Sequence, residues 1–426
     1  MHPALYKIIN RLLSRKPLRE KNIHLPGNKS LNILIIIPYA PYPVYTGGAS
    51  RIFEKIKYFG SRHYLVIACC YKNNIEKKKT RKLLEAYCNK LILVERKKPY
   101  IKSSETLPEK VLHVSIKNMW DKLANIKIKF DVVMFEHIYT AMYRPLFENC
   151  FTVLEEHNIE SKILEQFSKY IVNNSINNTL SKDLYQTLRK ETDLLEEFET
   201  QNWSLFNLRT TVSQVDCDIM GERCNNKILV VKNGINTSEI LPVEYNGKNS
   251  ILFMGHMSYQ PNIQGIKYFV DCIFPILQAS EPNTVLYIAG RDPAIEIMKL
   301  VDGKNIICIS NPDDMSSIAS SCYASVVPLQ MGSGTRIKIM HSMALGLPVI
   351  STSIGCEGMT ITDGKHLLIR DDPESFAQGI LEIKRNPSER ARLIQNSLLF
   401  VRQEHNLNKI FEIYETELFK ILTESG

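Results

Sequence analysis

The 426-residue sequence lacks several features that mark whole classes of protein. No apolar run reaches the roughly 18 residues needed to cross a bilayer, and the first residues carry no apolar stretch of the kind that directs secretion. The ten cysteines form no Cys-x-x-Cys pair, and the ten histidines form no His-Glu-x-x-His. These absences argue against a zinc ribbon, a thioredoxin-type motif and a helical zinc site. We therefore expect a cytoplasmic protein with no bound metal and no cofactor.

Positive charge is abundant but unevenly spread. The formal net charge is +8, and residues 71–104 contain only three glutamates beside a cluster of Lys and Arg. Such a patch suits an anionic membrane surface or an acidic acceptor, or it is a solvated face. No zinc-finger, RNP or GXXG signature accompanies it, so we expect no nucleic acid partner. The cluster comprises Lys72, Lys77, Lys78, Lys79, Arg81, Lys82, Lys90, Arg96, Lys97, Lys98 and Lys102.

The order of apolar runs predicts two α/β domains of about 200 residues each. Continuous aliphatic runs, typical of parallel strands buried on both faces, alternate with helical patterns and glycine turns. In the first half we expect strands at 32–38, 65–70, 91–95, 131–135, 151–154 and 208–212, with helical stretches at 49–59 and 161–207. In the second half we expect strands at 251–254, 284–289, 305–309, 324–328, 348–351 and 366–369, with helices at 263–278, 314–321 and 335–345. This alternation is typical of doubly wound parallel sheets.

A renewed strand–helix rhythm after residue 234 sets the expected domain boundary. The expected divisions are a basic N-terminal appendage at 1–30, a first Rossmann-like domain at 31–234, a second Rossmann-like domain at 235–404 and a helix at 405–426 that returns to the first domain.

Residues 328–358 carry the strongest motif of the chain. Gly332 and Gly334 let backbone approach a ligand closely, and Thr335 can cap the helix that follows. The free N–H groups of that helix favour an anion such as a diphosphate. Arg336 and Lys338, expected one turn inside the helix, add two positive charges. The alternative is a structural glycine turn with surface cations.

This block resembles the donor-binding signature of family 4 glycosyltransferases of the GT-B fold. Three further segments are similar to the same family, namely the glycine turn at 47–50, the interdomain motif at 233–236 and the start of the donor domain at 253–262. The resemblance implies two Rossmann-like doubly wound domains that face each other across a cleft. It assigns donor binding to Gly47, Gly48, Gly255, His256, Ser333, Gly334, Thr335, His341 and Glu357.

The resemblance also implies an activity. A sugar is transferred, with retention and without metal, from a nucleotide diphosphate donor to a glycan or lipid-linked acceptor, as in bacterial surface polysaccharide synthesis. Arg336 and Lys338 then stabilise the departing diphosphate.

Two positions depart from the family pattern. The family usually carries glutamates where this chain has Ser333 and His341. Serine can bond a sugar hydroxyl and histidine a ribose hydroxyl, so a donor site remains feasible. A packed, structural His341 fits the sequence equally well. In the nearby glycine loop, Glu357 is a donor-binding candidate, whereas Cys356 has no positioned base and is expected to be inert.

The first domain offers polar residues at two strand ends. The family often places a histidine where this chain has Glu136, and His137 follows. Because ligands lie at the carboxyl ends of parallel strands, either residue can orient donor or acceptor, although a structural role is an equal alternative. His157 and Asn158 end the next strand and are acceptor-side candidates.

Two other functions stay open. A sugar-nucleotide epimerase of related fold would need no second substrate. A non-catalytic partner subunit of the same fold would bind the donor without transferring its sugar. This alternative stays open because Ser333 and His341 replace the usual glutamates.

Overall fold

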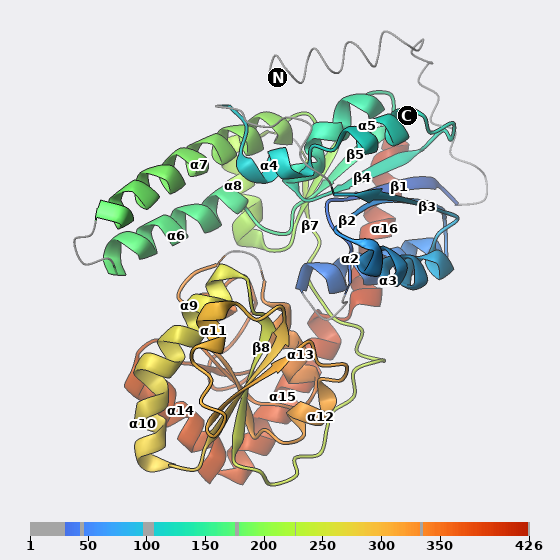
Figure 1. Cartoon of the computed structure of the whole chain (residues 1–426). Helices are drawn as coiled ribbons and strands as arrows, with labels where there is room; N and C mark the ends of the chain where they lie inside the picture. The colour runs from blue at the N-terminus through green and yellow to red at the C-terminus, as the bar shows by residue number, and fades with distance from the viewer. Residues whose placement is uncertain are drawn as a thin grey trace. The chain divides into compact units, whose positions relative to one another are not determined.

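The computed structural model describes residues 30–42, 47–96, 106–174, 179–225, 227–332 and 335–424 (Figure 1). The chain divides into two compact units. Unit 1 contains Met1–Tyr42, Ile52–Val231 and Phe411–Gly426, and unit 2 contains Pro43–Arg51 and Lys232–Ile410. Within the described ranges, no helix is both long and apolar enough to cross a membrane. The expected basic appendage at 1–30 lies almost wholly outside these ranges.

Unit 1 is built on a sheet of seven strands in the order β3-β2-β1-β4-β5-β6-β7, each pair parallel. The strands are β1 (Asn32–Ile37), β2 (Tyr64–Tyr71), β3 (Lys90–Glu95), β4 (Val132–Glu136), β5 (Phe151–Glu155), β6 (Leu208–Thr211) and β7 (Ile228–Val230). The aliphatic run from Ile33 to Ile37 is wholly buried, as its composition predicts. The strand order reverses between β1 and β4. Ligands of such sheets bind outside the carboxyl ends of the strands at this switch point.

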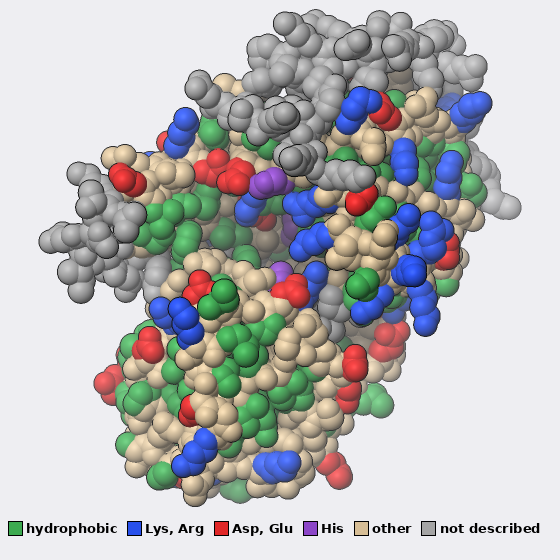
Figure 2. Space-filling view, viewed as in Figure 1, with side chains coloured by type: hydrophobic (Ala, Val, Ile, Leu, Met, Phe, Trp, Pro, Cys, Tyr) green, Lys and Arg blue, Asp and Glu red, His purple; other side chains and the backbone are tan. Residues whose placement is uncertain are grey.

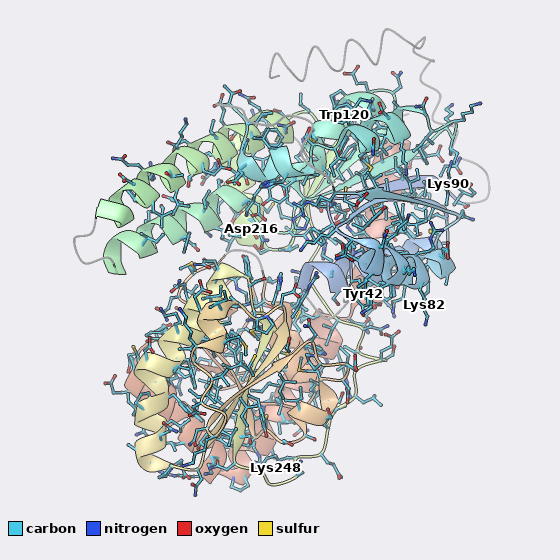
Figure 3. The ribbon with its side chains drawn as sticks, in the orientation of Figure 1. Tyr42, Lys82, Lys90, Trp120, Asp216 and Lys248 are labelled. Atoms are coloured by element: carbon cyan, nitrogen blue, oxygen red, sulfur yellow. The ribbon has the colours of Figure 1, made fainter. Side chains whose placement is uncertain are left out.

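The helices of unit 1 connect these parallel strands. They are α2 (Gly47–Gly60), which begins in unit 2, α3 (Asn74–Leu84), α4 (Glu109–Val114), α5 (Lys117–Ala124), α6 (Glu160–Asn174), α7 (Thr179–Trp203) and α8 (Gln214–Arg223), with 3-10 segments η1 (Glu85–Tyr87) and η2 (Ile138–Phe147). The expected single helical stretch at 161–207 is thus two helices. Trp120 on α5 is buried in the core (Figure 3).

Unit 2 contains a second parallel sheet, of six strands in the order β10-β9-β8-β11-β12-β13. The strands are β8 (Ser250–His256), β9 (Val285–Arg291), β10 (Ile306–Ser310), β11 (Ala324–Val327), β12 (Val349–Ser351) and β13 (Leu368–Ile369). Its helices are α9 (Gln260–Tyr268), α10 (Phe274–Ser280), α11 (Ile295–Met298), α12 (Ser316–Ala319), α13 (Ile337–Ala344), α14 (Pro373–Arg385) and α15 (Pro387–Glu404), with the π segment η3 (Phe269–Ile273) and the 3-10 turn η4 (Ile354–Cys356). The prediction of two doubly wound parallel sheets is confirmed.

The C-terminal helix α16 (Leu407–Glu424) starts in unit 2 and continues in unit 1 from Phe411. In unit 1 its Glu415 accepts a hydrogen bond from the Tyr58 hydroxyl (2.8 Å) and lies 2.7 Å from Nε2 of His63. Tyr414 is also buried there. Polar as well as apolar contacts therefore hold this helix on unit 1.

A basic surface covers α3 and its neighbour β3, where Figure 2 shows Lys and Arg side chains gathered on unit 1. Lys82 on α3 and Lys90 on β3, labelled in Figure 3, are both exposed. Its described members are Lys72, Lys77, Lys78, Lys79, Arg81, Lys82, Lys90 and Arg96. The other three cations of the cluster, Lys97, Lys98 and Lys102, lie outside the described residues.

Candidate functional site

The start of α13 in unit 2 brings together Arg336 and Lys338, the two cations expected to bind a diphosphate. The helix begins at Ile337, and Arg336 occupies the N-cap position. The expected cap by Thr335 is wrong: its hydroxyl is buried and makes no hydrogen bond within the described residues. The carbonyl oxygen of Thr335 instead accepts a hydrogen bond from Nδ2 of Asn233, at 3.3 Å. The helix starts two residues later than the expected 335–345. Arg336 and Lys338 therefore lie at the start of the helix rather than one turn inside it.

Arg336 folds back over the glycine turn that precedes it. A Cβ atom on Gly332 would lie 2.4 Å from Nη2 of Arg336, and the φ of Gly332 is +146°. Only glycine leaves space for the guanidinium here. Nη2 also donates to the carbonyl of Ile354, at 3.4 Å. Ser333 and Gly334, between these residues, lie outside the described ranges.

Lys338 is half-buried and has a neutral partner. Its Nζ atom donates to Oδ1 of Asn262 at 2.6 Å and lies 4.4 Å from the ring centre of Phe253. Burial, and then the charge of Arg336, lower the pKa of Lys338 to about 7. No carboxylate within the described residues forms an ion pair with this ammonium. An anion that binds beside it would therefore relieve an uncompensated charge.

The end of β8 and the start of α9 lie beside Lys338 in unit 2. A Cβ atom on Gly255 would lie 3.1 Å from Nζ of Lys338, so the glycine allows the lysine to approach the backbone. The carbonyl of His256 accepts a hydrogen bond from Nδ2 of Asn262, at 2.7 Å. Asn262 thus links Lys338 to His256. Asn262 ends the 253–262 segment, and its residue type alone does not predict this linking role.

The remaining unit 2 candidates lie around α13. His341 is half-buried on α13, where burial lowers its pKa to about 4 and keeps the ring neutral. Glu357 follows η4 and is partly exposed. Burial raises the pKa of Cys356 to about 11, which fits an inert thiol.

Gly47 and Gly48 begin α2 rather than forming a turn before it. A Cβ atom on Gly47 would lie 3.7 Å from Cδ1 of Ile337, an ordinary contact, so sterics do not require this glycine. On the same turn, Arg51 donates to the carbonyl of Lys232 at 2.9 Å and to Oδ1 of Asn233 at 3.1 Å.

In unit 1, Glu136 ends β4 and is wholly buried. Its two oxygens lie 2.8 Å from Nζ of Lys55 and 2.7 Å from Nε2 of His157. Both oxygens are therefore engaged inside the protein. Lys55, from α2, also pairs with Glu155 at 2.7 Å.

His137 follows β4 in an unusual conformation. Its φ is +62°, a strained value for a residue with a side chain. Its Nε2 atom lies 2.8 Å from the hydroxyl of Tyr39, and its buried Nδ1 has no hydrogen-bond partner within the described residues. Burial, and then the neighbouring His157, lower its pKa to about 3. The ring is therefore neutral.

His157 and Asn158 follow β5. The ring of His157 is 6% exposed and lies 4.0 Å, centre to centre, from the ring of His137. Asn158 is partly exposed. Two residues later, Glu160 forms an ion pair with Lys110 at 3.0 Å. The described residues contain no group of three His, Cys, Asp or Glu side chains arranged to hold a metal ion.

Sequence reasoning missed Lys55, although a signal was present. Lys55 falls on the helical face that carries Ile52, Ile56 and Phe59, all wholly buried. A lysine on an apolar face requires a buried counter-charge. The sequence alone does not say which carboxylate supplies it.

Comparison with known proteins locates the family signal in unit 2. Residues 248–386 match the family model described as "Glycosyl transferases group 1". A curated relative, the "Uncharacterized 44.6 kDa protein in cps region" of Klebsiella pneumoniae, is 23% identical over 400 residues, which cover 89% of this chain and 97% of the relative.

Solved structures share the whole fold at low sequence identity. Sucrose-phosphate synthase from Thermosynechococcus elongatus matches with a TM-score of 0.67 at 13% identity, covering 93% of this chain and 100% of that one. HepE of Anabaena, in complex with UDP, matches at 0.60 and 13%, covering 92% and 100%. The pneumococcal O-GlcNAc transferase GtfA, in complex with UDP and GlcNAc, matches at 0.64 and 9%, covering 92% and 99%. The GT-B fold is confirmed, and the family match with this fold supports glycosyl transfer as the activity.

Proposed function

We propose that the chain transfers a sugar from a nucleotide diphosphate donor, bound in unit 2 at the start of α13, to a glycan or lipid-linked acceptor. Lys338 carries the proposal. Its half-buried ammonium lacks a carboxylate partner within the described residues and stands beside Arg336 at a helix N-terminus. A helix N-terminus with two adjacent cations favours a diphosphate. HepE and GtfA were each solved with UDP, which supports a nucleotide-sugar donor.

The proposed reaction retains the configuration of the sugar and needs no metal. As the bond between sugar and diphosphate breaks, negative charge grows on the leaving phosphate oxygens. The Arg336 guanidinium offers a fork of N–H donors and Lys338 a single ammonium, so both stabilise this charge. The acceptor hydroxyl then reaches the sugar on the face from which the diphosphate departs. Anomeric assignment of the product by NMR tests retention, and an inverted product would contradict it.

In unit 1 we assign Glu136 and His137 to the catalytic region and His157 and Asn158 to the acceptor side. All four follow or end strands next to the switch point of the sheet. Glu136 is buried between Lys55 and His157, so it acts through its neighbours. The relative encoded in a cps region supports an acceptor that belongs to a surface polysaccharide.

The basic surface on α3 and β3 fits a cytoplasmic enzyme that rests on the inner face of the membrane. Each well-placed cation contributes about 1 kcal/mol to binding an anionic bilayer. A hollow of about 530 Å³, whose lining includes Lys77, Arg81, Lys90 and Lys122, lies on the same side of the unit.

A panel of sugar nucleotides tests the function. We expect one nucleotide family to raise the unfolding temperature, and its sugar to be transferred to a polyprenyl-linked or glycan acceptor. Donor consumption without any acceptor, with a new sugar nucleotide as product, would indicate an epimerase instead. Donor binding without transfer to any acceptor would indicate a non-catalytic subunit.

A further inference from the structure

Two segments of unit 2 that lie next to the unit boundaries of the chain are joined to each other. The backbone N–H of Ile235 donates to the carbonyl of His405 at 2.9 Å, and the N–H of Leu407 donates to the carbonyl of Ile235 at 3.1 Å. A Cβ atom on Gly234 would lie 2.4 Å from the carbonyl oxygen of His405, so only glycine allows this approach. The backbone around Gly234 is therefore held firmly in place.

Asn233, the residue before this glycine, uses its side chain and its backbone carbonyl at the same time. Its Oδ1 atom accepts a hydrogen bond from Nη1 of Arg51 at 3.1 Å, and its Nδ2 atom donates to the carbonyl of Thr335 at 3.3 Å. Its backbone carbonyl accepts from Nδ1 of His405 at 2.7 Å. Asn233 is 5% exposed, so these contacts form in the interior of unit 2.

The two contacts of the amide require asparagine at this position. The guanidinium of Arg51 can only donate, so the end of the amide that faces it is the oxygen. The carbonyl of Thr335 can only accept, so the other end is the NH₂ group. Aspartate has the same size but lacks a donor for Thr335. Residues 182 and 102 positions away in the sequence thus fix one side chain between them.

The contact with Thr335 explains why α13 begins at Ile337. With Thr335 as its N-cap, the helix would bind the carbonyl of this residue through the N–H of Ile339, four residues later. Asn233 binds that carbonyl, and the N–H of Ile339 donates instead to the carbonyl of Arg336 at 2.9 Å. Arg336 is thereby left outside the helix as its N-cap, with a φ of −90° and a ψ of 96°.

We propose that Asn233 is a positioning residue for the diphosphate site, because its amide sets the first residue of α13 and thereby the place of the Arg336 guanidinium. A helical Arg336 would have a ψ near −42°, roughly 140° from the observed value. The guanidinium that now lies against Gly332 would then be carried away from it. The inference rests on the proposed function, since Asn233 acts on the reaction through Arg336.

Asn233→Asp is the sharpest test, because it keeps the size of the side chain and removes one contact. Aspartate still accepts from Arg51, as an ion pair, but has no N–H for Thr335. We expect the unfolding temperature to change little. In the full chain without ligand, the backbone amides of residues 335–339 should exchange hydrogen faster than in the wild type. Hydrogen exchange measured by mass spectrometry on peptides that span 329–345 checks this.

Asn236→Asp is the matched control, because it makes the same chemical change three residues later on the same segment. Its Oδ1 atom accepts from the backbone N–H of Ser238 at 3.3 Å and from the Ser238 hydroxyl at 2.6 Å, and aspartate keeps both contacts. We expect hydrogen exchange at the start of α13 and turnover to match the wild type in this variant.

Turnover shows whether the positioning matters for the reaction. Asn233→Asp should lower kcat by about tenfold, as expected for the loss of one buried hydrogen bond, and change KM less. In an Arg336→Ala background it should lower kcat by less than about twofold, because the side chain that Asn233 positions is gone. The neutral variant Asn233→Ala should show the same exchange and kcat changes. Its unfolding temperature should also fall, because Arg51 loses an acceptor.

Unchanged hydrogen exchange at the start of α13 in Asn233→Asp, or an equal loss of kcat with and without Arg336, would overturn the inference. So would a loss of turnover in Asn233→Asp that Asn233→Ala does not share, since it would come from the added charge. If Asn233→Asp does not fold, the same measurements on Asn233→Ala decide the question. If the wild type transfers no sugar, the proposed function fails, and hydrogen exchange still shows whether Asn233 sets the start of α13.

Discussion

The Nζ atom of Lys338 donates to Oδ1 of Asn262 at 2.6 Å, so this half-buried lysine meets an amide rather than a carboxylate. Its pKa is lowered to about 7 by burial and by the charge of Arg336. Below that pH the ammonium is present, and above it the free protein increasingly loses the proton. A diphosphate stabilises the charged form, so its binding requires proton uptake above about pH 7.

We therefore predict that nucleoside diphosphate affinity falls as the pH rises from about 7 to 9, approaching tenfold per pH unit. Calorimetry in buffers of different ionisation enthalpy should show the proton uptake. In Lys338→Arg, whose guanidinium stays charged, the affinity should vary little over this range. Equal affinity of the wild type across the range would contradict the placement of the diphosphate beside Lys338.

Arg336 should matter most to turnover. Loss of a charged contact that forms mainly in the transition state costs about 3 kcal/mol, or roughly a hundredfold in rate. Arg336→Ala should lower kcat by that factor with the fold intact, and Lys338→Ala somewhat less. Lys78→Ala, which removes an exposed cation on α3, is the control and should leave donor chemistry unchanged. Near-normal kcat and product affinity in both site variants would rule out α13 as the diphosphate site.

Substitution of His341 should show whether this residue contacts the donor ribose or only packs against its neighbours. The ring is neutral because burial lowers its pKa to about 4. A neutral ring that contacts the ribose acts similarly in ground and transition states, so His341→Ala should raise the donor KM more than it lowers kcat. Steady-state kinetics and thermal unfolding, measured together, check this. Unchanged donor affinity with a lower unfolding temperature would show that His341 only packs.

Much of the fold could be predicted because its signals are local. The aliphatic run at 32–38 predicted a buried parallel strand, and β1 is wholly buried from Ile33 to Ile37. The sequence predicts a helix start at Thr335 because this residue type is a common N-cap, but its carbonyl is bound by Asn233, 102 positions away, and α13 starts at Ile337. Lys338 and Asn262 are 76 positions apart, and Glu136 and Lys55 are 81 apart. Such pairings depend on how the strands are ordered in space, which residue types alone do not specify.

The basic surface predicts salt-sensitive membrane binding. Vesicles that contain anionic lipid should co-sediment with the protein at low ionic strength and release it as salt increases. Replacing Lys78, Lys79 and Lys82 by Gln should weaken this binding, while vesicles of neutral lipid should bind neither protein. If the protein fails to bind anionic vesicles even at low salt, the basic surface on α3 and β3 is only a solvated face.

We expect transfer to continue in excess chelator, because the proposed charge stabilisation comes from Arg336, Lys338 and the α13 N-terminus. Rates measured with and without EDTA should agree. Activity that disappears with EDTA and returns with added magnesium or manganese would contradict the metal-free reaction.

The position of Tyr414 in the chain has a consequence for biosynthesis. This tyrosine donates to Glu155, and the next residue, Glu415, contacts Tyr58 and His63, so unit 1 is completed by residues that follow unit 2 in the sequence. During translation, the buried carboxylate of Glu155 on β5 cannot form its hydrogen bond with Tyr414 until unit 2 and then α16 have been synthesised. We expect unit 1 to reach its final protease resistance only after α16 has been made, and ribosome-bound chains that lack α16 to be cut readily in unit 1.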